Sequence, residues 1–286
     1  MLKEVLANYL PPSELHEISS AFDVIGDIVI IKIPKCLISK KELIGEALLD
    51  NVKPAKSVFI QTSAIKGDFR VRNLELLAGA DKTETEYKEH GCRFKVDVVK
   101  AYFSPRLSTE RLRVAKMVRD NEVITNMFGG VGTYSILMAK KNKTCKVYSI
   151  DSNPVAAELC RINAKLNRVE DKVISILGDA REVIEKQIGG KSNRVLMPLP
   201  EKAKEFVSSA IKALIEGNGI IHYFAHIRAS NRKQGLHEGV IDTEDAFRNF
   251  NHDILQTRIV REVGPRLYQI VSDVYLCNDQ FNLISS

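Results

Sequence analysis

The chain has 286 residues, enough for one large domain or two, and it can bury a sizeable core. Its 44% hydrophobic and 27% charged residues are ordinary for a globular protein, and no apolar run reaches the roughly 20 residues that cross a bilayer. Lys and Arg outnumber Asp and Glu by 42 to 36, which permits a polyanionic partner without establishing one. Because the amino terminus carries no signal-like apolar segment, we expect a cytoplasmic protein.

Metal and disulfide chemistry have little support in the sequence. The five cysteines are scattered, and none forms a C-x-x-C pair. His222 and His226 stand four apart, but the segment around them predicts a strand, where that spacing does not bring two ligands together as it would on a helix. We therefore predict no metal site.

The first 100 residues predict a small α+β domain. Strand-like patterns cover 23–34, 57–65 and 92–103, and a short helical pattern covers 40–50. A helix is expected over 104–118, entered through Pro105 with Ser108 as its N-cap.

Residues 101–286 alternate between strand and helix patterns. Strands are predicted at 122–128, 146–151, 172–180, 194–200 and 219–227, with helices at 133–141, 154–167, 181–188 and 201–217. Short crossovers between such strands predict a parallel, doubly wound sheet. Two final strand-like runs, at 256–264 and 266–277, predict an antiparallel pair at the sheet edge.

A glycine-rich turn, "NMFGGVGTYSILMAK" at 126–140, follows the first of these strands. Such a turn lets a cofactor approach the backbone, and Asp151 at the end of the next strand is placed to accept ribose hydroxyls. Ser135 stands where the dinucleotide fingerprint has Gly or Ala, so a pyrophosphate fits imperfectly. S-adenosylmethionine suits the turn, Asp151 and the later "GDAR" equally well, and a plain tight turn is the non-functional alternative.

Taken together, the glycine turn, "IDSNP", "GDAR" and "YFSPRLSTERLRVA" resemble the archaeal and eukaryotic tRNA methyltransferases that modify N1 of guanosine 37, with the wyosine-pathway enzymes as close relatives. The resemblance runs from about residue 22 to 275, and "SPRLSTER" is its specific motif. It implies an α/β fold with a class I Rossmann-like methyltransferase sheet in 101–286, preceded by a small α+β domain in 1–100 that contacts RNA.

The resemblance also implies roles for individual residues. S-adenosylmethionine is expected at Arg111, Phe128, Gly130, Gly132, Asp151, Asp179 and Ala180. Glu110 matches the general base that removes the N1 proton, and Arg70 in "GDFRVRN" is the best match for an arginine that stabilises charge at O6, although spacing alone does not exclude Arg72. The expected partner is the anticodon loop of tRNA, and the expected state is a monomer.

Several positions depart from the family pattern. Pro198 stands in the substrate pocket where relatives have the asparagine of "NLP", and proline offers neither a side-chain donor nor a backbone N–H. Asn126 replaces the usual Asp, and Gly129 the usual Ala. Only about twenty residues precede the matched region, so we expect the additional tRNA-contacting domain of many relatives to be absent.

These departures keep alternatives open. The second enzymatic hypothesis is methylation of C7 of the tricyclic wyosine precursor at position 37, alone or in addition to N1 methylation. Transfer of the aminocarboxypropyl group ranks lower because Asp151 stands where we expect Glu in those relatives. A tRNA-binding protein with a degenerate cofactor pocket and an NAD-dependent oxidoreductase are the remaining classes, and Ser135 argues against the latter.

Overall fold

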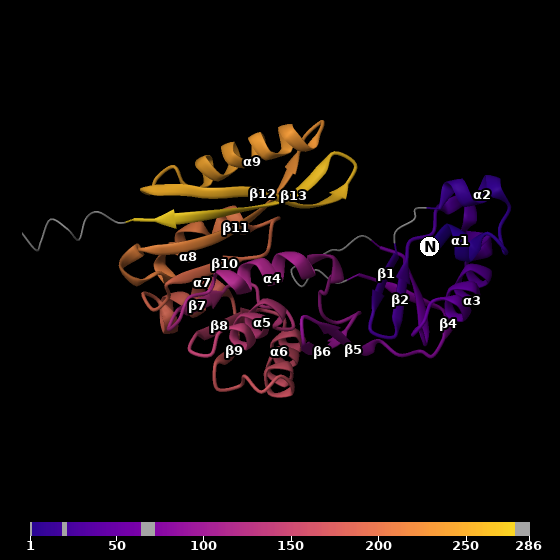
Figure 1. Cartoon of the computed structure of the whole chain (residues 1–286), viewed down its shortest axis with the longest axis horizontal. Helices are drawn as coiled ribbons and strands as arrows, with labels where there is room; N and C mark the ends of the chain where they lie inside the picture. Colours follow the sequence, from indigo (N-terminus) through magenta and orange to yellow (C-terminus); the bar gives the residue numbers. More distant parts are fainter. Residues whose placement is uncertain (1, 19–21, 64–71, 278–286) are drawn as a thin grey trace, which may run out of the picture. The chain divides into compact units, whose positions relative to one another are not determined.

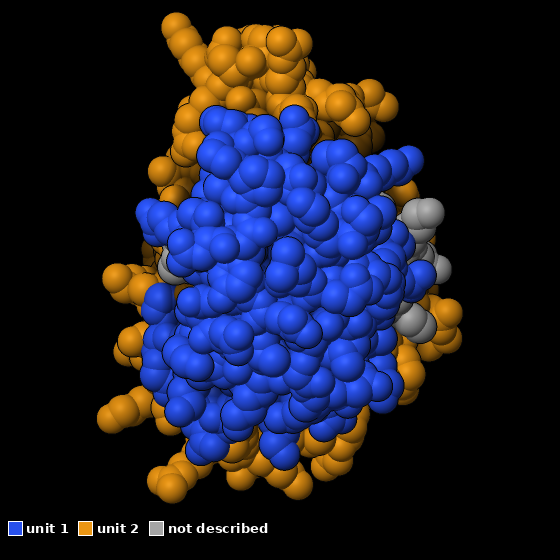
Figure 2. All heavy atoms as spheres, turned by 90° about the vertical axis from the view of Figure 1, so that its right-hand side faces the viewer, with its two compact units in different colours: residues 1–105 blue, residues 106–286 orange. Residues whose placement is uncertain are grey.

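The computed structural model describes residues 2–18, 22–63 and 72–277 of the chain. Two compact units divide it, residues 1–105 and residues 106–286, and Figure 2 shows them in separate colours. None of the helices within the described ranges has the length and apolarity needed to cross a membrane.

Unit 1 combines a mixed sheet, a hairpin and short helices. Its described elements are α1 (Leu2–Leu6), α2 (Pro12–Glu17), β1 (Phe22–Ile25), β2 (Ile28–Ile31), η1 (Lys35–Lys40), α3 (Lys41–Asn51), β3 (Ser57–Gln61), β4 (Leu74–Gly79), β5 (Glu84–Glu89) and β6 (Cys92–Asp97). The strand order is β1-β2-β3-β4, and only β2 and β3 run parallel; β5 and β6 form a separate antiparallel pair. Helices α1 and α3 share an apolar core with this sheet, which confirms the predicted α+β character.

The single strand expected over 23–34 is wrong, because the chain turns at Gly26 and forms the β1–β2 hairpin. Gly26 has φ of +58°, a left-handed conformation that favours glycine. A Cβ at position 26 would lie 2.1 Å from Thr85 Oγ1, so there is also no room for a side chain in this turn. Strands β4 and β5 were not predicted.

Unit 2 is built around a mostly parallel sheet (Figure 1). Its elements in the described range are η2 (Pro105–Leu107, at the unit boundary), α4 (Ser108–Met117), β7 (Val123–Asn126), α5 (Thr133–Lys141), β8 (Lys146–Asp151), α6 (Pro154–Leu166), β9 (Val173–Leu177), α7 (Ala180–Val183), a π-helical turn η3 (Ile184–Ile188), β10 (Arg194–Met197), η4 (Ala203–Phe206), α8 (Val207–Ala213), η5 (Ile215–Gly217), β11 (Gly219–Arg228), α9 (Arg232–Phe247), β12 (His252–Gly264) and β13 (Leu267–Leu276).

The strand order of this sheet is β12-β13-β11-β10-β7-β8-β9. Strands β9, β8, β7, β10 and β11 are parallel, and β13 runs antiparallel to both β11 and β12. The parallel sheet with a carboxyl-terminal antiparallel hairpin is therefore confirmed. The order changes direction between β7 and β10, and this switch point is where open α/β sheets bind ligands.

Helices cover both faces of the sheet. On one face α7, α8 and α9 contribute to a core with β10, β11 and β13. On the other, α5 and α6 pack against each other and against β8 and β9, and α4 packs against α5. Along β11 the side chains alternate, so Tyr223 joins the first core while Phe224 meets Tyr134 of α5. His222 shares the face of Phe224, which is the side covered by α4 and α5.

Two local predictions in unit 2 are corrected. Ser108 is the first residue of α4, and the N-cap position belongs to Leu107 because the short η2 helix runs directly into α4. Helix α9 was not predicted at all, and it lies along β12 and β13 in Figure 1.

Candidate functional site

The glycine turn links β7 to α5 at the switch point of the sheet. Gly130 and Gly132 have φ of +54° and +89°, which favour glycine over residues with a Cβ. A Cβ on Gly132 would also lie 2.7 Å from Cys160 Sγ on α6. The conformation therefore favours glycine at both positions, and at position 132 the available space requires it as well.

Asp151 ends β8 and holds this turn with its carboxylate. Oδ2 accepts a hydrogen bond from the Gly130 amide at 2.6 Å, and Oδ1 accepts one from the Asn153 amide at 2.9 Å. Burial raises the pKa of Asp151, although these two hydrogen bonds oppose the shift. A carboxylate offers about four lone-pair positions, so two remain for ligand hydroxyls.

The third strand end adds an aromatic and charged cluster. Asp179 follows β9 and caps α7 by accepting the Arg181 amide at 2.8 Å. Burial alone would raise the pKa of Asp179, but the Arg181 guanidinium holds it below its usual value. That guanidinium lies 4.4 Å from the ring centroid of Phe206, which in turn meets Phe128 edge-on at 5.0 Å. Phe128, Asp179 and the buried Ala180 are thus brought together.

Arg181 and Phe206 were missed by the sequence reasoning. Arg181 is the last residue of "GDAR", and Phe206 precedes α8 in "KEFVSS". Neither has a spacing that singles it out, because their contact joins segments that are distant in sequence. Phe206 contacts Phe128, and Arg181 contacts Phe206, so both residues lie at the candidate site.

Beneath the turn, small polar side chains fill the space between β7, β8 and α5. Asn126 Nδ2 donates to Ser135 Oγ at 3.1 Å, and Ser135 Oγ donates to Ser149 Oγ at 2.8 Å. Asn126 Oδ1 is buried and accepts no hydrogen bond from any described residue.

The substitution of glycine for the family's alanine at position 129 has a local reason. A Cβ on Gly129 would lie 2.3 Å from Ser149 Oγ. We expect Gly129→Ala to destabilise the protein by about 1–3 kcal/mol, since overpacking a buried site forces its neighbours to move. Adding Ser149→Ala should recover part of that loss. Urea unfolding of the two single variants and the double variant measures this coupling, and strictly additive effects would contradict it.

Glu110 lies in the first turn of α4 and is only 2% exposed. Its Oε1 accepts two hydrogen bonds from Arg113, from Nε at 2.9 Å and from Nη2 at 2.7 Å. Its Oε2 accepts none within the described residues, although Arg258 Nη1 lies 3.5 Å away. Burial raises the pKa of Glu110 against the opposing effect of Arg113. A buried carboxylate with a raised pKa and one oxygen that accepts no hydrogen bond is suited to accept a proton.

Arg111 and Pro198 are two further site residues that the sequence predicts. Arg111 is buried in α4 next to Glu110. Pro198 directly follows β10, the neighbour of β7, at the carboxyl edge of the sheet. Among the described residues, the hydrogen-bond and ion-pair partners of Glu110 are Arg113 on α4 and Arg258 on β12, and neither belongs to the glycine turn.

Arg70 falls in 64–71, outside the described residues. The alternative, Arg72, is described: its Nη1 donates to Gln61 Oε1 at 3.4 Å and lies 3.7 Å from Asp23 Oδ2. Its guanidinium is therefore engaged within unit 1. The catalytic arginine stays a prediction.

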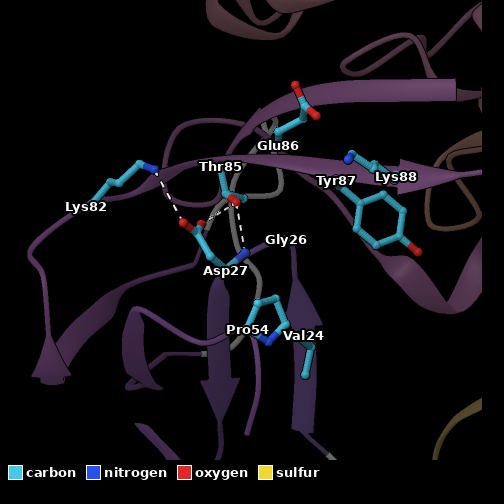
Figure 3. A pocket seen from close by; sticks show the side chains of 9 residues that line it. All are labelled: Val24, Gly26, Asp27, Pro54, Lys82, Thr85, Glu86, Tyr87 and Lys88. Atoms are coloured by element: carbon cyan, nitrogen blue, oxygen red, sulfur yellow. Dashed lines mark hydrogen bonds and ion pairs between the residues drawn. The ribbon is translucent and has the colours of Figure 1, made fainter.

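Unit 1 has a cleft of its own, of about 520 Å³ (Figure 3). Asp27, Lys82, Thr85, Glu86, Tyr87 and Lys88 are among its lining residues. Thr85 Oγ1 donates to Asp27 at 2.6 Å, and Lys82 Nζ lies 3.6 Å from the same carboxylate. Because the acidic and basic lining residues are balanced, this cleft gives no sign of an anion site, and no predicted cofactor residue lines it. Across the described ranges, no group of three or more His, Cys, Asp or Glu is placed to hold a metal ion.

The doubly wound sheet, the glycine turn at its switch point and the antiparallel hairpin define a Rossmann-like protein of the methyltransferase class. The chain belongs to the TRM5/TYW2 methyltransferase family. The model of the TRM5/TYW2 methyltransferase domain matches residues 85–251, and that of the TYW2 N-terminal domain matches residues 2–83.

Curated relatives are named for methylation of guanine N1, for methylation of 4-demethylwyosine, for both reactions, and for aminocarboxypropyl transfer to 4-demethylwyosine. The tRNA (guanine(37)-N(1))-methyltransferases Trm5b of Methanocaldococcus jannaschii and Pyrococcus abyssi are 44% and 41% identical over 90% and 92% of this chain, and the matches cover 71% and 77% of those proteins. The tRNA 4-demethylwyosine(37)-methyltransferase Taw21 of Saccharolobus solfataricus is 34% identical over 91% of this chain and 95% of its own length.

Solved structures agree with this assignment. A complex of an archaeal Trm5 with tRNA(Leu) has a TM-score of 0.82 at 38% identity and covers 96% of this chain and 77% of its own. Trm5 of Methanocaldococcus jannaschii in complex with adenosine has a TM-score of 0.77 at 38% identity and covers 92% of this chain and 76% of its own.

Proposed function

We propose that this chain transfers the methyl group of S-adenosylmethionine to N1 of guanosine 37 in tRNA. The observation that carries the proposal is the buried Glu110 with its free Oε2, within the "SPRLSTER" motif of a chain whose Trm5b relatives are 41–44% identical to it. The relatives' names supply the reaction, and the carboxylate supplies the proton acceptor that it needs.

The proposed cofactor site is the carboxyl edge of β7, β8 and β9. The glycine turn lies at the switch point of the sheet, and Asp151 keeps two lone-pair positions for ribose hydroxyls. Phe128 and Asp179 form the third part of the same edge. When bound there, S-adenosylmethionine supplies an electrophilic methyl group.

The chemistry of the acceptor base explains the need for Glu110. Guanine N1 carries a proton and is a poor nucleophile until that proton leaves. In the proposed mechanism Glu110 Oε2 takes the proton, while a guanidinium, for which Arg70 is the candidate, stabilises negative charge at O6. The base must leave its stack to reach a protein carboxylate, which is easiest in a flexible loop such as the anticodon loop. Unit 1 is proposed to contact the RNA, and the chain to act as a monomer.

A second candidate is methylation of C7 of the tricyclic wyosine precursor. Pro198 favours it, because the asparagine contact of the N1-methylating pattern is not available there. At C7 the N1 proton has already gone, so a lost contact near N1 has a smaller effect.

Two tRNA substrates separate these reactions. One carries unmodified guanosine 37 and the other carries the tricyclic precursor, and each is incubated with labelled S-adenosylmethionine before nucleoside mass spectrometry. We expect methyl on N1 of the first substrate. Methyl only on C7 of the second would overturn the proposal in favour of the wyosine reaction. Binding of both tRNAs with no transfer would leave an RNA-binding protein.

The same assay tests Pro198. We expect Pro198→Asn to raise the ratio of N1 to C7 product about tenfold, because one new hydrogen bond is worth about 1 kcal/mol or somewhat more. Pro265→Asn is the matched control, since Pro265 is an exposed residue in the loop between β12 and β13. A product ratio unaltered by Pro198→Asn would exclude this residue as the determinant of the reaction.

A further inference from the structure

A row of charged and polar side chains begins at Glu110 and crosses the buried face of the sheet in unit 2. It connects α4, β13, β11, β10 and the segment before β7. In order, the row consists of Glu110, Arg113, Asp273, His222, Arg194 and Glu122. Each link is a hydrogen bond of 2.5–2.9 Å, and no member of the row belongs to the proposed cofactor site.

Arg113 bridges the two carboxylates at the start of this row. Its Nε and Nη2 both donate to Glu110 Oε1, while Nη1 and Nη2 donate to Asp273 Oδ2 and Oδ1 at 2.5 Å and 2.9 Å. Because both donors reach the same oxygen of Glu110, its other oxygen is left without a hydrogen bond. Arg258 Nη1 lies 3.5 Å from this second oxygen, farther than an ordinary hydrogen bond, so the lone pairs of Oε2 stay available to a proton.

Asp273 is held as an anion behind Arg113. It lies on β13 directly opposite His222 of β11, whose Nδ1 is 2.6 Å from Oδ1. Although burial alone would raise the pKa of Asp273, the hydrogen bonds from His222 and Arg113 hold it far below its usual value. Asp273 therefore carries a permanent negative charge at every pH at which the enzyme is expected to work.

His222 is fixed in one tautomer by its second neighbour. Arg194 Nη1 lies 2.9 Å from His222 Nε2, and a guanidinium can only donate, so Nε2 accepts and Nδ1 carries the proton. Burial lowers the pKa of His222, which keeps the ring neutral, in spite of Asp273. Arg194 is held in turn by Glu122 at 2.7 Å and 2.9 Å.

The charged residues around Glu110 have opposite effects on its pKa. Arg113 on its own would stabilise the ionised carboxylate and weaken it as a base, and Arg258 on β12 acts in the same direction. Asp273, on the far side of Arg113, raises the pKa of Glu110 and so offsets part of that effect. His222 is neutral, and Arg194 lies beyond it.

We infer that Asp273 is a positioning residue for Glu110: through Arg113 it fixes Oε1, leaves Oε2 free to take a proton, and offsets the charge of Arg113 so that Glu110 stays basic. This inference deepens the proposed function and rests on Glu110 acting as its base. Arg113 is the positioning residue between them. Neither residue needs to touch the tRNA or the cofactor.

The test is the pH dependence of single-turnover methyl transfer by Asp273→Asn in the full chain. Since Glu110 must be deprotonated, the wild-type rate rises with pH through the pKa of Glu110. Without the negative charge of Asp273 that limb should move to lower pH by about one unit, and the plateau should fall about three- to tenfold because the base is weaker. A plateau that falls with no movement of the limb would mean a merely structural role and would overturn the inference.

Two further variants keep the test decisive. Asp273→Glu retains the charge, and its limb should stay at the wild-type pH whatever happens to the plateau. Arg113→Met removes the positive charge, so its limb should move in the opposite direction, to higher pH. If Asp273→Asn does not fold, an unmoved limb in Arg113→Met overturns the inference by itself.

The titration of Glu110 can also be followed without any reaction. Carbon-13 spectra of carboxyl-labelled glutamate, assigned by comparison with Glu110→Gln, report its pKa directly in wild type and variants. A shifted pKa in a protein that leaves guanosine 37 unmethylated would sustain the positioning role and reject the proposed function. An unshifted pKa in Asp273→Asn and in Arg113→Met would reject the positioning role, whatever the activity.

Discussion

Replacing Glu110 by Gln is expected to lower single-turnover methyl transfer to guanosine 37 by about 10²- to 10⁴-fold, the usual contribution of a general base. The amide keeps the size of the side chain and can still accept the hydrogen bonds of Arg113, but it cannot take a proton. Cofactor affinity should stay unchanged, because Glu110 pairs with Arg113 and Arg258 and not with the glycine turn or Asp151. Rapid quench with labelled cofactor measures the rate, and equilibrium dialysis measures the affinity.

Glu158→Gln is the matched control for this variant. Glu158 and Arg161 form the same Glu–Arg pair at the same i, i+3 spacing as Glu110 and Arg113, but on α6 and exposed to solvent. It should transfer methyl at the wild-type rate. The acidic limb of the wild-type pH profile should also be missing from Glu110→Gln, since burial raises the pKa of Glu110 and its protonation stops the reaction. A full-rate Glu110→Gln enzyme would remove this residue as the base.

Asp151→Asn is expected to weaken the binding of S-adenosylmethionine by roughly 30- to 1,000-fold, or about 2–4 kcal/mol. The carboxylate accepts the amides of Gly130 and Asn153, one with each oxygen. An asparagine turns an NH₂ group toward one of these N–H donors, so the glycine turn loses a hydrogen bond and its shape. The ribose hydroxyls lose a charged acceptor as well.

Isothermal titration of cofactor into both proteins measures this effect. Asp171→Asn serves as the control, because Asp171 is an exposed residue in the loop before β9. Burial raises the pKa of Asp151, so wild-type affinity should fall with decreasing pH at a higher pH than an ordinary aspartate would give. Equal affinities for wild type and Asp151→Asn would exclude Asp151 as a cofactor residue.

The regular part of unit 2 was accessible from the sequence because its signals are local. The bounds predicted for α5 and β8 coincide with the structure, and Pro154 begins α6 as expected. Helix α9 was missed because it has glycines at 235 and 239 in its interior, which weaken a helix taken alone. Those glycines allow close packing: a Cβ at Gly235 would lie 3.1 Å from the ring of Tyr268. Because this reason for glycine lies in tertiary packing, it produces no helical pattern in the local sequence.

Some residues of the candidate site could likewise be predicted from local spacing, and others could not. The glycine turn, Asp151 and Asp179 lie at strand ends within one stretch of chain, so their spacing predicts their meeting. The partner that holds Arg113, Asp273, is 160 positions away in sequence, and nothing near Glu110 predicts it. The same is true of the Phe128–Phe206 contact. Long-range pairs of this kind depend on the strand order, which places β13 beside β11.

The row of charges from Glu110 to Glu122 gives helix α4 an attachment to the sheet that responds to heat differently from an apolar one. Desolvating ions becomes less unfavourable as temperature rises, because the hydration of charged groups carries a strongly negative entropy, whereas stabilisation by apolar burial levels off. Arg113 and Arg194 connect α4 and the segment after it to the sheet through ions that are buried (Glu110, Asp273 and Arg194) or mostly buried (Arg113 and Glu122). The fraction of the free energy holding α4 to the sheet that comes from these ion pairs therefore increases with temperature. Glu110, the candidate base on α4, is held in place at temperatures where the contribution of apolar packing no longer increases.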